Sequence, residues 1–592
     1  MILKELYFRT IQFLRLKLTR VQLIILIAIF IGLAAGLIAV LLKTMVHHIQ
    51  HWITGITISQ FAFLVFPAIG LVIAVYLLRR FFGGSLEKGI PLVLKAIALR
   101  SSFIPRKHTY AHVLTSSITV GFGGSVGLEA PIVATGSAIG SNISRISDLN
   151  YQERTLLIGC GAAAGIAAVF NAPIAGVIFA VEVLLPEAIL SYFIPLIISS
   201  VVGVLCSKII LAESSLFNFV LQENFNYRNV PFYILLGLLT GFVSLYYARV
   251  FKATEHRIHQ WKIGSYGKAA LSGLFLLGIY FILPPLYGEG YNSVKIVANG
   301  NFYSFSDNTT LFSWLGENWS VIAFTALIVL IKPVAAGITI GAGGNGGNFA
   351  PSLFVGSFLG FFFSRLINTM PWFKIPVGNF SLAAMAGVLS GVMYCPLTSI
   401  FLIAEITNGY ELFIPLMIVS SISFFLVKSY EPYSMDTKKL AIEGEMFTHK
   451  KEKNILTSIR LKDMLQDSYE TIGADKKLGD LVNLIRQSRK NIFAVVDKHE
   501  KFVGVIELND IKQQIFQPEL FESTLVTTLV KKPPAVLQDD LDMHTVMERF
   551  DITQSWYLPV LDHQKRFLGF VSKTKLFSKY REILSSSGDL YE

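Results

Sequence analysis

The stretch "GFGGSVGLEAPIVATGSAIGS" runs from Gly121 to Ser141 and contains one charged residue, Glu129. Glycines, other small residues and aliphatic side chains surround this carboxylate in the sequence, and none of them offers it a positive partner. Small residues let helix backbones approach closely, whereas an unpaired carboxylate is costly to bury. The role of Glu129 therefore depends on its environment, which the composition of the whole chain indicates.

The chain is too apolar for a soluble protein of its length. Of its 592 residues 53% are hydrophobic and only 15% are charged, and the mean hydropathy is +0.56. Soluble domains usually have about 45–50% apolar and about 25% charged residues. Several apolar runs approach the ~20 residues that cross a bilayer as a helix, which predicts a polytopic membrane protein. These runs cover residues 21–42, 59–78, 189–211, 230–247, 269–286, 320–340 and 412–427.

Two shorter apolar pieces, residues 162–183 and 383–406, are interrupted by Gly, Pro or Asn. Broken helices are tolerated in a membrane only where protein or a water-filled cavity covers the freed backbone. We therefore expect these pieces to line a pathway or a site.

The charge distribution predicts the orientation. Residues 1–20 are basic and amphipathic, which predicts an interfacial helix on the cytoplasmic side and no removed signal peptide. The formal net charge of +11 has the same origin and gives no reason to expect nucleic acid as a partner. Cys160, Cys206 and Cys395 lie in apolar segments without metal-binding spacing, so we expect packing residues and no zinc site.

An internal repeat organises the apolar part. "GLEAP" begins at Gly127 and "GNFAP" begins at Gly347, an offset of 220 residues. Pro173 and Pro396 each precede a glutamate by nine positions, and "FIPLIISS" and "FIPLMIVSS" follow in the same order. The repeat predicts two homologous halves, residues 21–212 and 230–435. Halves with interrupted helices at matching positions are typical of transporters, and free helix N-termini there favour an anion.

These motifs resemble, in order and spacing, the signatures of the CLC family of chloride channels and chloride/proton exchangers. The resemblance covers residues 21–435 and includes "GGNFAP", "FNAPIAGVIFAVEV", the upstream "KGIP" and "EPYS". It implies an α-helical polytopic membrane fold, an inverted repeat of two halves with broken helices. It also implies anion transport by a homodimer in the cell membrane, with both termini in the cytoplasm. No enzyme activity, metal or required cofactor is expected.

In that family the glutamate of the element that matches "GLEAP" is the gate. Its carboxylate competes with the anion for the outer site, and it swings out or becomes protonated to let ions pass. Glu129 matches that position, which agrees with a burial cost of about 2.5 kcal/mol or more for a membrane carboxylate. A capping role for Glu129, and close helix packing for the glycines, are the alternatives. The resemblance also implies anion-binding residues, which are Lys88, Gly127, Leu128, Gly347, Asn348, Phe349 and Tyr433.

Two departures from the family pattern bear on transport. Exchangers carry an inner proton glutamate at the position that is Val183 here, and chloride channels also carry valine there. The sequence therefore favours a channel or an uncoupled carrier, with a chloride/proton antiporter as the alternative. Most chloride-selective members carry serine where this chain has Lys88, whose ammonium either lines the ion path or extends to the cytoplasmic mouth.

Residues beyond about 435 are more polar and also contain a repeat. Residues 436–456 form a linker, and residues 457–520 and 521–585 resemble a pair of CBS motifs with an α/β fold, each with two strands followed by a helix. CBS pairs often bind adenine nucleotides, and Asp510 and Ser572 are the candidates here, although neither unit has the full set of ligands. A pair that only holds the dimer together, or a nucleotide-sensing protein that conducts no ions, are the alternatives.

Overall fold

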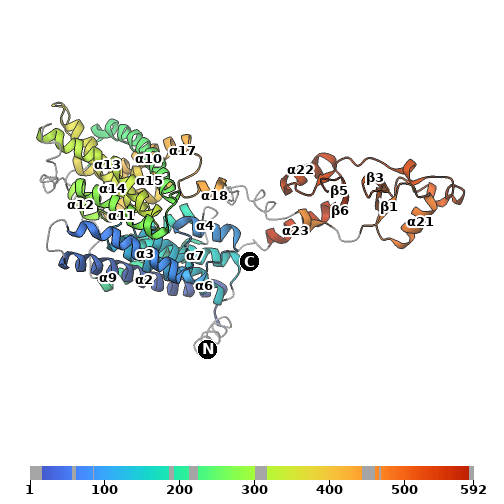
Figure 1. Ribbon diagram of the computed structural model, residues 1–592, viewed down its shortest axis with the longest axis horizontal. Coiled ribbons are helices and arrows are strands. Elements are labelled where there is room, and N and C mark those ends of the chain that lie inside the picture. The colour runs from blue at the N-terminus through green and yellow to red at the C-terminus, as the bar shows by residue number, and fades with distance from the viewer. Residues whose placement is uncertain are drawn as a thin grey trace. The chain divides into compact units, whose positions relative to one another are not determined.

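The computed structural model describes residues 17–56, 62–84, 86–147, 149–185, 192–211, 225–299, 316–407, 409–442, 461–465 and 469–585. The chain divides into two compact units, Met1–Met446 and Phe447–Leu590 (Figure 1). Most of the predicted interfacial helix over residues 1–20 lies outside the described residues.

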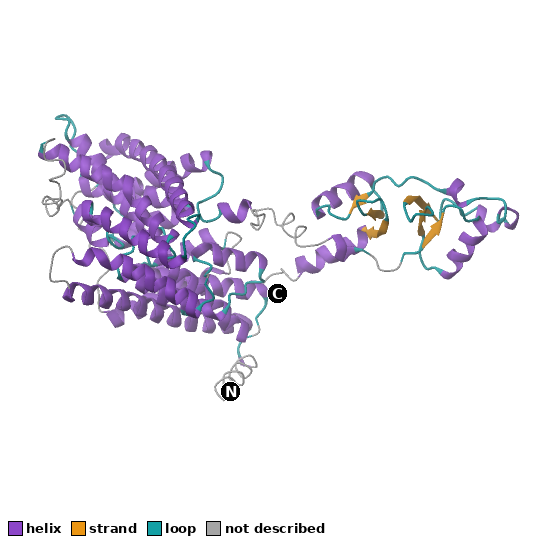
Figure 2. Ribbon diagram, viewed as in Figure 1, coloured by secondary structure: helices purple, strands orange, loops and turns teal. Residues whose placement is uncertain are grey.

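The first unit is helical, as Figure 2 shows. Each of the seven long apolar runs lies mainly within one helix. The first half of the repeat contains α2 (Arg20–Ile56), α3 (Phe66–Phe81), α4 (Gly89–Leu99), α5 (Ala111–Gly121), α6 (Glu129–Ile146), α7 (Tyr151–Phe170), α8 (Pro173–Phe179), the π-helical turn η3 (Ala180–Leu184) and α9 (Phe193–Leu211).

The second half repeats this order from α12 onward. It contains α10 (Val230–His259), α11 (Ser265–Ile282), α12 (Tyr291–Ala298), α13 (Glu317–Gly341), α14 (Phe349–Asn368), α15 (Val377–Met393), α16 (Pro396–Ile406) and α17 (Phe413–Tyr430). The short helix α18 (Lys438–Ile442) follows, within the segment that was predicted as a linker. Eight helices among the described residues are long and apolar enough to cross a membrane. The three cysteines are free and buried, which agrees with a packing role.

Local sequence explains the breaks between helices. Asn150 and Glu153 form a capping box that starts α7, and Asn171 ends it in the left-handed conformation, φ 56°. Pro173 then starts α8, where its missing N–H costs nothing. In the second half Tyr394, φ 59°, ends α15 in the same way before Pro396 starts α16.

The two halves hold each other's broken helices in place. Glu182, in η3, accepts hydrogen bonds from the backbone N–H groups of Leu397 and Thr398 at 3.0 and 2.8 Å, at the start of α16. Glu405, near the end of α16, accepts from Ile174 and Ala175 at 3.0 and 2.8 Å, at the start of α8. Each glutamate therefore satisfies free donors of the opposite half.

The second unit contains two three-stranded sheets of the same topology. In each sheet the first strand is parallel to the second, and the second is antiparallel to the third. The first sheet contains β1 (Thr471–Gly473), β2 (Ile492–Val496) and β3 (Phe502–Glu507), with α21 (Leu478–Gln487) between β1 and β2. The second contains β4 (Leu537–Gln538), β5 (Tyr557–Leu561) and β6 (Phe567–Ser572), with α22 (Met543–Thr553) and the terminal α23 (Lys573–Ser585).

The sheets meet at the hairpins β2–β3 and β5–β6, where the rings of Phe502 and Phe567 stack with centroids 5.8 Å apart. The expected helix after the last strand is present in the second repeat as α23. The same prediction is wrong for the first repeat, where turns and the short 3₁₀ helix η8 (Gln514–Phe516) follow β3.

Candidate functional site

The starts of α6 and α14 meet through a two-residue bridge. Gly127 donates its N–H to the carbonyl of Gly347 at 2.9 Å, and Gly347 donates back to Gly127 at 2.8 Å. Both glycines lie two residues before their helices begin, so the two helix N-termini are held side by side. Two positive helix ends at one place form a site for an anion or a carboxylate.

Glycine is required at this bridge because the two backbone segments approach each other so closely. A Cβ atom at Gly347 would lie 2.6 Å from the Cβ of Ala130, and one at Gly127 would collide with the carboxylate of Glu129. Real Cβ atoms do not make such contacts, so a larger residue would push the two helix starts apart.

Glu129 is the first residue of α6, and it is 1% exposed. The sequence offered it no partner, but the structure does: the hydroxyl of Tyr291, at the start of α12, donates a hydrogen bond to its Oε1. Its Oε2 atom is buried and makes no hydrogen bond of ordinary geometry among the described residues. The backbone N–H of Ala350, in the first turn of α14, is near enough to interact with this carboxylate.

A second carboxylate lies beside the first. Glu289 precedes α12, and it interacts electrostatically with Glu129 and with the backbone N–H of Leu128. Lys332, on α13, is fully buried and donates to the carbonyls of Leu286 and Gly288 at 3.3 and 3.1 Å. Lys332 thereby holds the segment that carries Glu289 and Tyr291.

The expected donors around the anion are partly occupied. The N–H of Gly347 donates to Gly127 in the bridge and is not available to an anion in this arrangement. The N–H groups of Asn348 and Phe349 have no backbone acceptor among the described residues and remain as donors. The hydroxyl of Tyr247 donates to the side-chain oxygen of Asn348 at 3.2 Å and holds the residue before α14.

Lys88 lies directly before α4 and is half-buried. Its Nζ donates to the carbonyl of Gly344 at 2.6 Å, in the glycine-rich loop that leads to α14. The ammonium therefore contacts the loop of the opposite half and does not simply extend into solvent.

Tyr433 and Val183 are the two remaining positions that the sequence singled out in the apolar part. Tyr433 is half-buried between α17 and α18, and its hydroxyl makes no hydrogen bond within the described part of the chain. Val183 lies in η3 directly after Glu182, which is engaged with the start of α16.

Sequence reasoning did not find Tyr291, Glu289 or Lys332. Their signal was present, because Lys332 is a charged residue in an apolar run and Glu289 stands between two glycines. A lone charge in a membrane segment is a functional hypothesis, but its partner is decided by the fold.

The candidate nucleotide residues in the second unit already have partners. The carboxylate of Asp510 pairs with Lys531 at 2.7 Å. The hydroxyl of Ser572 is buried and accepts from the backbone N–H of Lys575 at 3.3 Å, at the start of α23.

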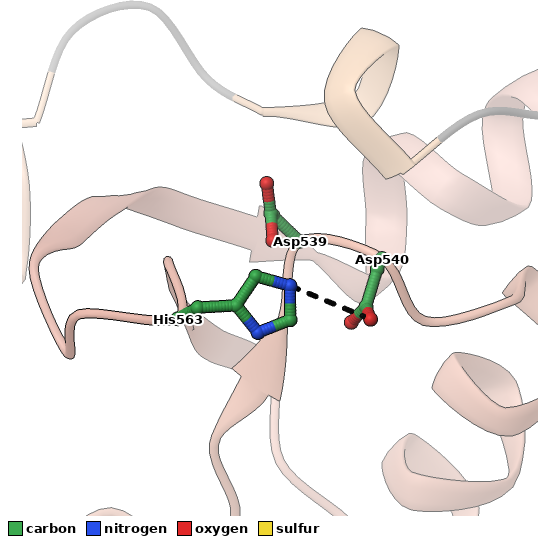
Figure 3. Close-up of side chains that lie close together, drawn as sticks. All are labelled: Asp539, Asp540 and His563. Atoms are coloured by element: carbon green, nitrogen blue, oxygen red, sulfur yellow. Dashed lines mark ion pairs between the residues drawn. The ribbon is translucent and has the colours of Figure 1, made fainter.

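Figure 3 shows a group of acidic and histidine side chains in the same unit. Potential ligand atoms of Asp539, Asp540 and His563 lie within 4.8 Å of one another, and His563 is 3.7 Å from Asp540. No metal is expected from the sequence. Exposed groups of this kind are common without an ion, so this geometry does not establish one.

The chain matches two family models and a relative of known name. The family model described as voltage gated chloride channel matches residues 70–428, and the CBS domain model matches residues 461–516. The H(+)/Cl(-) exchange transporter ClcA of Salmonella arizonae is 26% identical over 415 residues, which cover 67% of this chain and 83% of that protein.

Two solved structures share the fold. A slow cyanobacterial Cl-/H+ antiporter is 20% identical with a TM-score of 0.62, and the match covers 72% of this chain and 98% of that chain. A eukaryotic CLC transporter is 15% identical with a TM-score of 0.59, and the match covers 93% and 97% of the two chains. These comparisons confirm the predicted family resemblance and fold class.

Proposed function

Because the chain belongs to the voltage-gated chloride channel family, we propose that it carries chloride or another small anion across a membrane and that Glu129 gates the pathway. The observation that carries the proposal is the buried carboxylate at two bridged helix N-termini. A carboxylate and a chloride ion satisfy the same N–H donors, so Glu129 occupies the place of an ion until it is protonated or displaced.

The donors Asn348 and Phe349 would hold the anion when Glu129 leaves. Gly127, Leu128 and Gly347 would shape this site through their backbone, and Tyr433 would supply a hydroxyl from the other side. The contact between Lys88 and Gly344 supports a place for the ammonium near the ion path, where its charge attracts anions.

We favour a channel or an uncoupled carrier because Val183 has no titratable group. Glu182 is a poor substitute for the missing inner glutamate, since three hydrogen bonds from Leu397 and Thr398 hold its carboxylate. A chloride/proton antiporter is the alternative, and the comparisons fit it about as well, because a relative is named an H(+)/Cl(-) exchange transporter.

The deciding experiment uses purified protein in liposomes loaded with chloride. Chloride efflux and internal pH are recorded together, with and without a proton uncoupler. Efflux that needs no proton movement identifies a channel or uncoupled carrier, whereas uphill proton movement driven by chloride identifies an antiporter. Absence of anion flux would support the alternative of a nucleotide-sensing protein that conducts no ions.

The gate is tested in the same assay. Glu129→Gln removes the charge and the titration of the gate, so we expect higher anion flux that no longer depends on pH. Unchanged flux and pH response in Glu129→Gln would remove this residue from the mechanism.

We further propose a homodimer in the cell membrane with both termini in the cytoplasm. Exposed apolar side chains on α9, including Ile194, Ile197 and Leu205, would face lipid or the second copy. The CBS pair would hold the dimer together or bind an adenine nucleotide. Calorimetry with ATP tests the nucleotide, and cross-linking in liposomes tests the dimer.

A further inference from the structure

Two buried carboxylate oxygens in the membrane unit are unsatisfied. These are Oε2 of Glu129 and Oε1 of Glu289, and neither makes a hydrogen bond among the described residues. Buried polar atoms are normally paired, so each unpaired oxygen needs a reason. A proton on either carboxyl group would supply a donor that two carboxylates otherwise lack.

The position of Glu289 links it to the start of α6. It lies in the segment between the 3₁₀ helix η6 (Pro284–Leu286) and α12, far from Glu129 in sequence. Its carboxylate interacts with the backbone N–H of Leu128, the residue before Glu129. The same helix start therefore faces two carboxylates.

The charged and titratable groups that interact with Glu289 come from four elements. They are Glu129 on α6, Lys332 on α13, Lys43 on α2 and the hydroxyl of Tyr291 on α12. Two interacting negative charges disfavour ionisation of both carboxyl groups at once. Lys332 compensates one negative charge, and it is held in place by two backbone carbonyls.

The ammonium of Lys332 is shielded from solvent. It is 0% exposed and its Nζ lies 4.5 Å from the ring centroid of Phe354 on α14. A buried ammonium needs a nearby anion, because an unpaired buried charge is costly. Glu289 is that anion whenever its carboxyl group has released its proton.

We propose that Glu289 is a second proton-binding residue of the pathway and exchanges one proton with Glu129. This proposal rests on the proposed gate. In the step, the proton leaves the Glu289 carboxyl group and binds the Glu129 carboxylate, and no other bond changes. Glu289 is then an anion beside Lys332, and neutral Glu129 no longer competes with the anion at the helix starts. The reverse transfer restores the closed gate.

A purely structural role is the competing explanation, with Glu289 as the permanently charged counter-ion of Lys332. That role predicts a carboxylate that never takes a proton in the working pH range. The two explanations therefore differ in a measurement of protonation, and this measurement does not depend on transport.

The test is infrared difference spectroscopy of the full-length protein in liposomes between neutral and mildly acidic pH. The Glu129→Gln variant removes the gate carboxyl group, and we expect a remaining band from a protonated carboxyl group. This band should disappear in Glu129→Gln/Glu289→Gln. The same spectrum in both variants would overturn the proposal.

Flux measurements test the exchange with the gate. Glu289→Gln removes a negative charge and a proton donor beside Glu129, so half-maximal flux should require about tenfold more protons, or about one lower pH unit. Glu411→Gln, an exposed glutamate before α17, is the matched control and should keep the pH of half-maximal flux. An unshifted pH in Glu289→Gln would overturn the exchange.

Glu289→Gln leaves Lys332 without its anion and can fail to fold. In that case the infrared experiment uses Glu289→Asp combined with Glu129→Gln, because aspartate keeps the carboxyl group. The carboxyl band should then move to a different frequency, and an unmoved band overturns the proposal. Failure of the gate itself is distinguishable, since it appears as retained pH dependence of flux in Glu129→Gln alone.

Discussion

Gly127 and Gly347, which the repeat places at equivalent positions 220 residues apart, are hydrogen-bonded to each other at 2.9 and 2.8 Å. Equivalent residues meet in this way only near the axis that relates the two halves. The bridge therefore marks the centre of the membrane unit. It also places two helix N-termini and Glu129 at the same point.

Replacing Gly347 with alanine tests the bridge. The added Cβ would lie 2.6 Å from Ala130, so Gly347→Ala should lower stability by about 1–3 kcal/mol and reduce anion flux. The thermal midpoint in detergent and liposome flux measure the two effects. Gly278→Ala on α11 is the control, because its Cβ meets nothing within 4 Å and should not destabilise the protein. Equal behaviour of the two variants would contradict the role of the bridge.

Replacing Tyr291 with phenylalanine tests the contact that holds the gate. Its hydroxyl donates to Glu129 and stabilises the charged carboxylate, so Tyr291→Phe should let the gate open at higher pH. We expect the pH of half-maximal flux to rise by about half to one unit. Tyr246→Phe loses a hydrogen bond to Leu330 instead and should leave this pH unchanged. A fall in the pH of half-maximal flux in Tyr291→Phe would show that the hydroxyl does not favour the charged gate.

Replacing Lys88 with serine tests the ion path. The substitution removes an ammonium that contacts Gly344, so the ratio of nitrate to chloride transport should change by several-fold. Competition between the two anions in the liposome assay measures this ratio. Lys374→Ser, at an exposed loop position, should keep it. Identical selectivity in Lys88→Ser would instead support an ammonium that only concentrates anions at the cytoplasmic mouth.

Glu431, directly after α17, gives a pH-dependent contribution to stability. The hydrogen bond from Lys438, with help from Arg249, lowers the pKa of this carboxyl group below its usual value. A lowered pKa in the folded state means that the stabilisation is present above the unfolded pKa of about 4.3 and is lost as pH falls through the folded value. Glu431→Gln should therefore cost about 0.5 kcal/mol at neutral pH, since both cations are exposed.

Thermal midpoints at neutral pH and below the folded pKa measure this difference. The gap between wild type and Glu431→Gln should close at acidic pH. A gap of the same size at both pH values would show that the side chain acts by packing and not by charge.

Much of the fold was predictable from local pattern. The long apolar runs became helices such as α2 and α13, because length and hydrophobicity suffice for a membrane span. The repeat of "GLEAP" and "GNFAP" pointed to the candidate site, because glycines beside the lone carboxylate of Glu129 are unusual in an apolar segment. The boundaries were less accurate: α10 continues to His259, twelve residues beyond the apolar run, since its polar end remains helical outside the hydrophobic stretch.

The sequence by itself determined the membrane class, the two halves, the C-terminal α/β repeat and the position of Glu129, because periodicity, composition and motif spacing are local properties. Tertiary structure alone decided which groups meet at that residue. Tyr291 and Glu289 come from a segment about 160 residues away, and Lys332 positions that segment from another helix. Such contacts depend on how the helices pack, and no local signal encodes the partner of a buried charge.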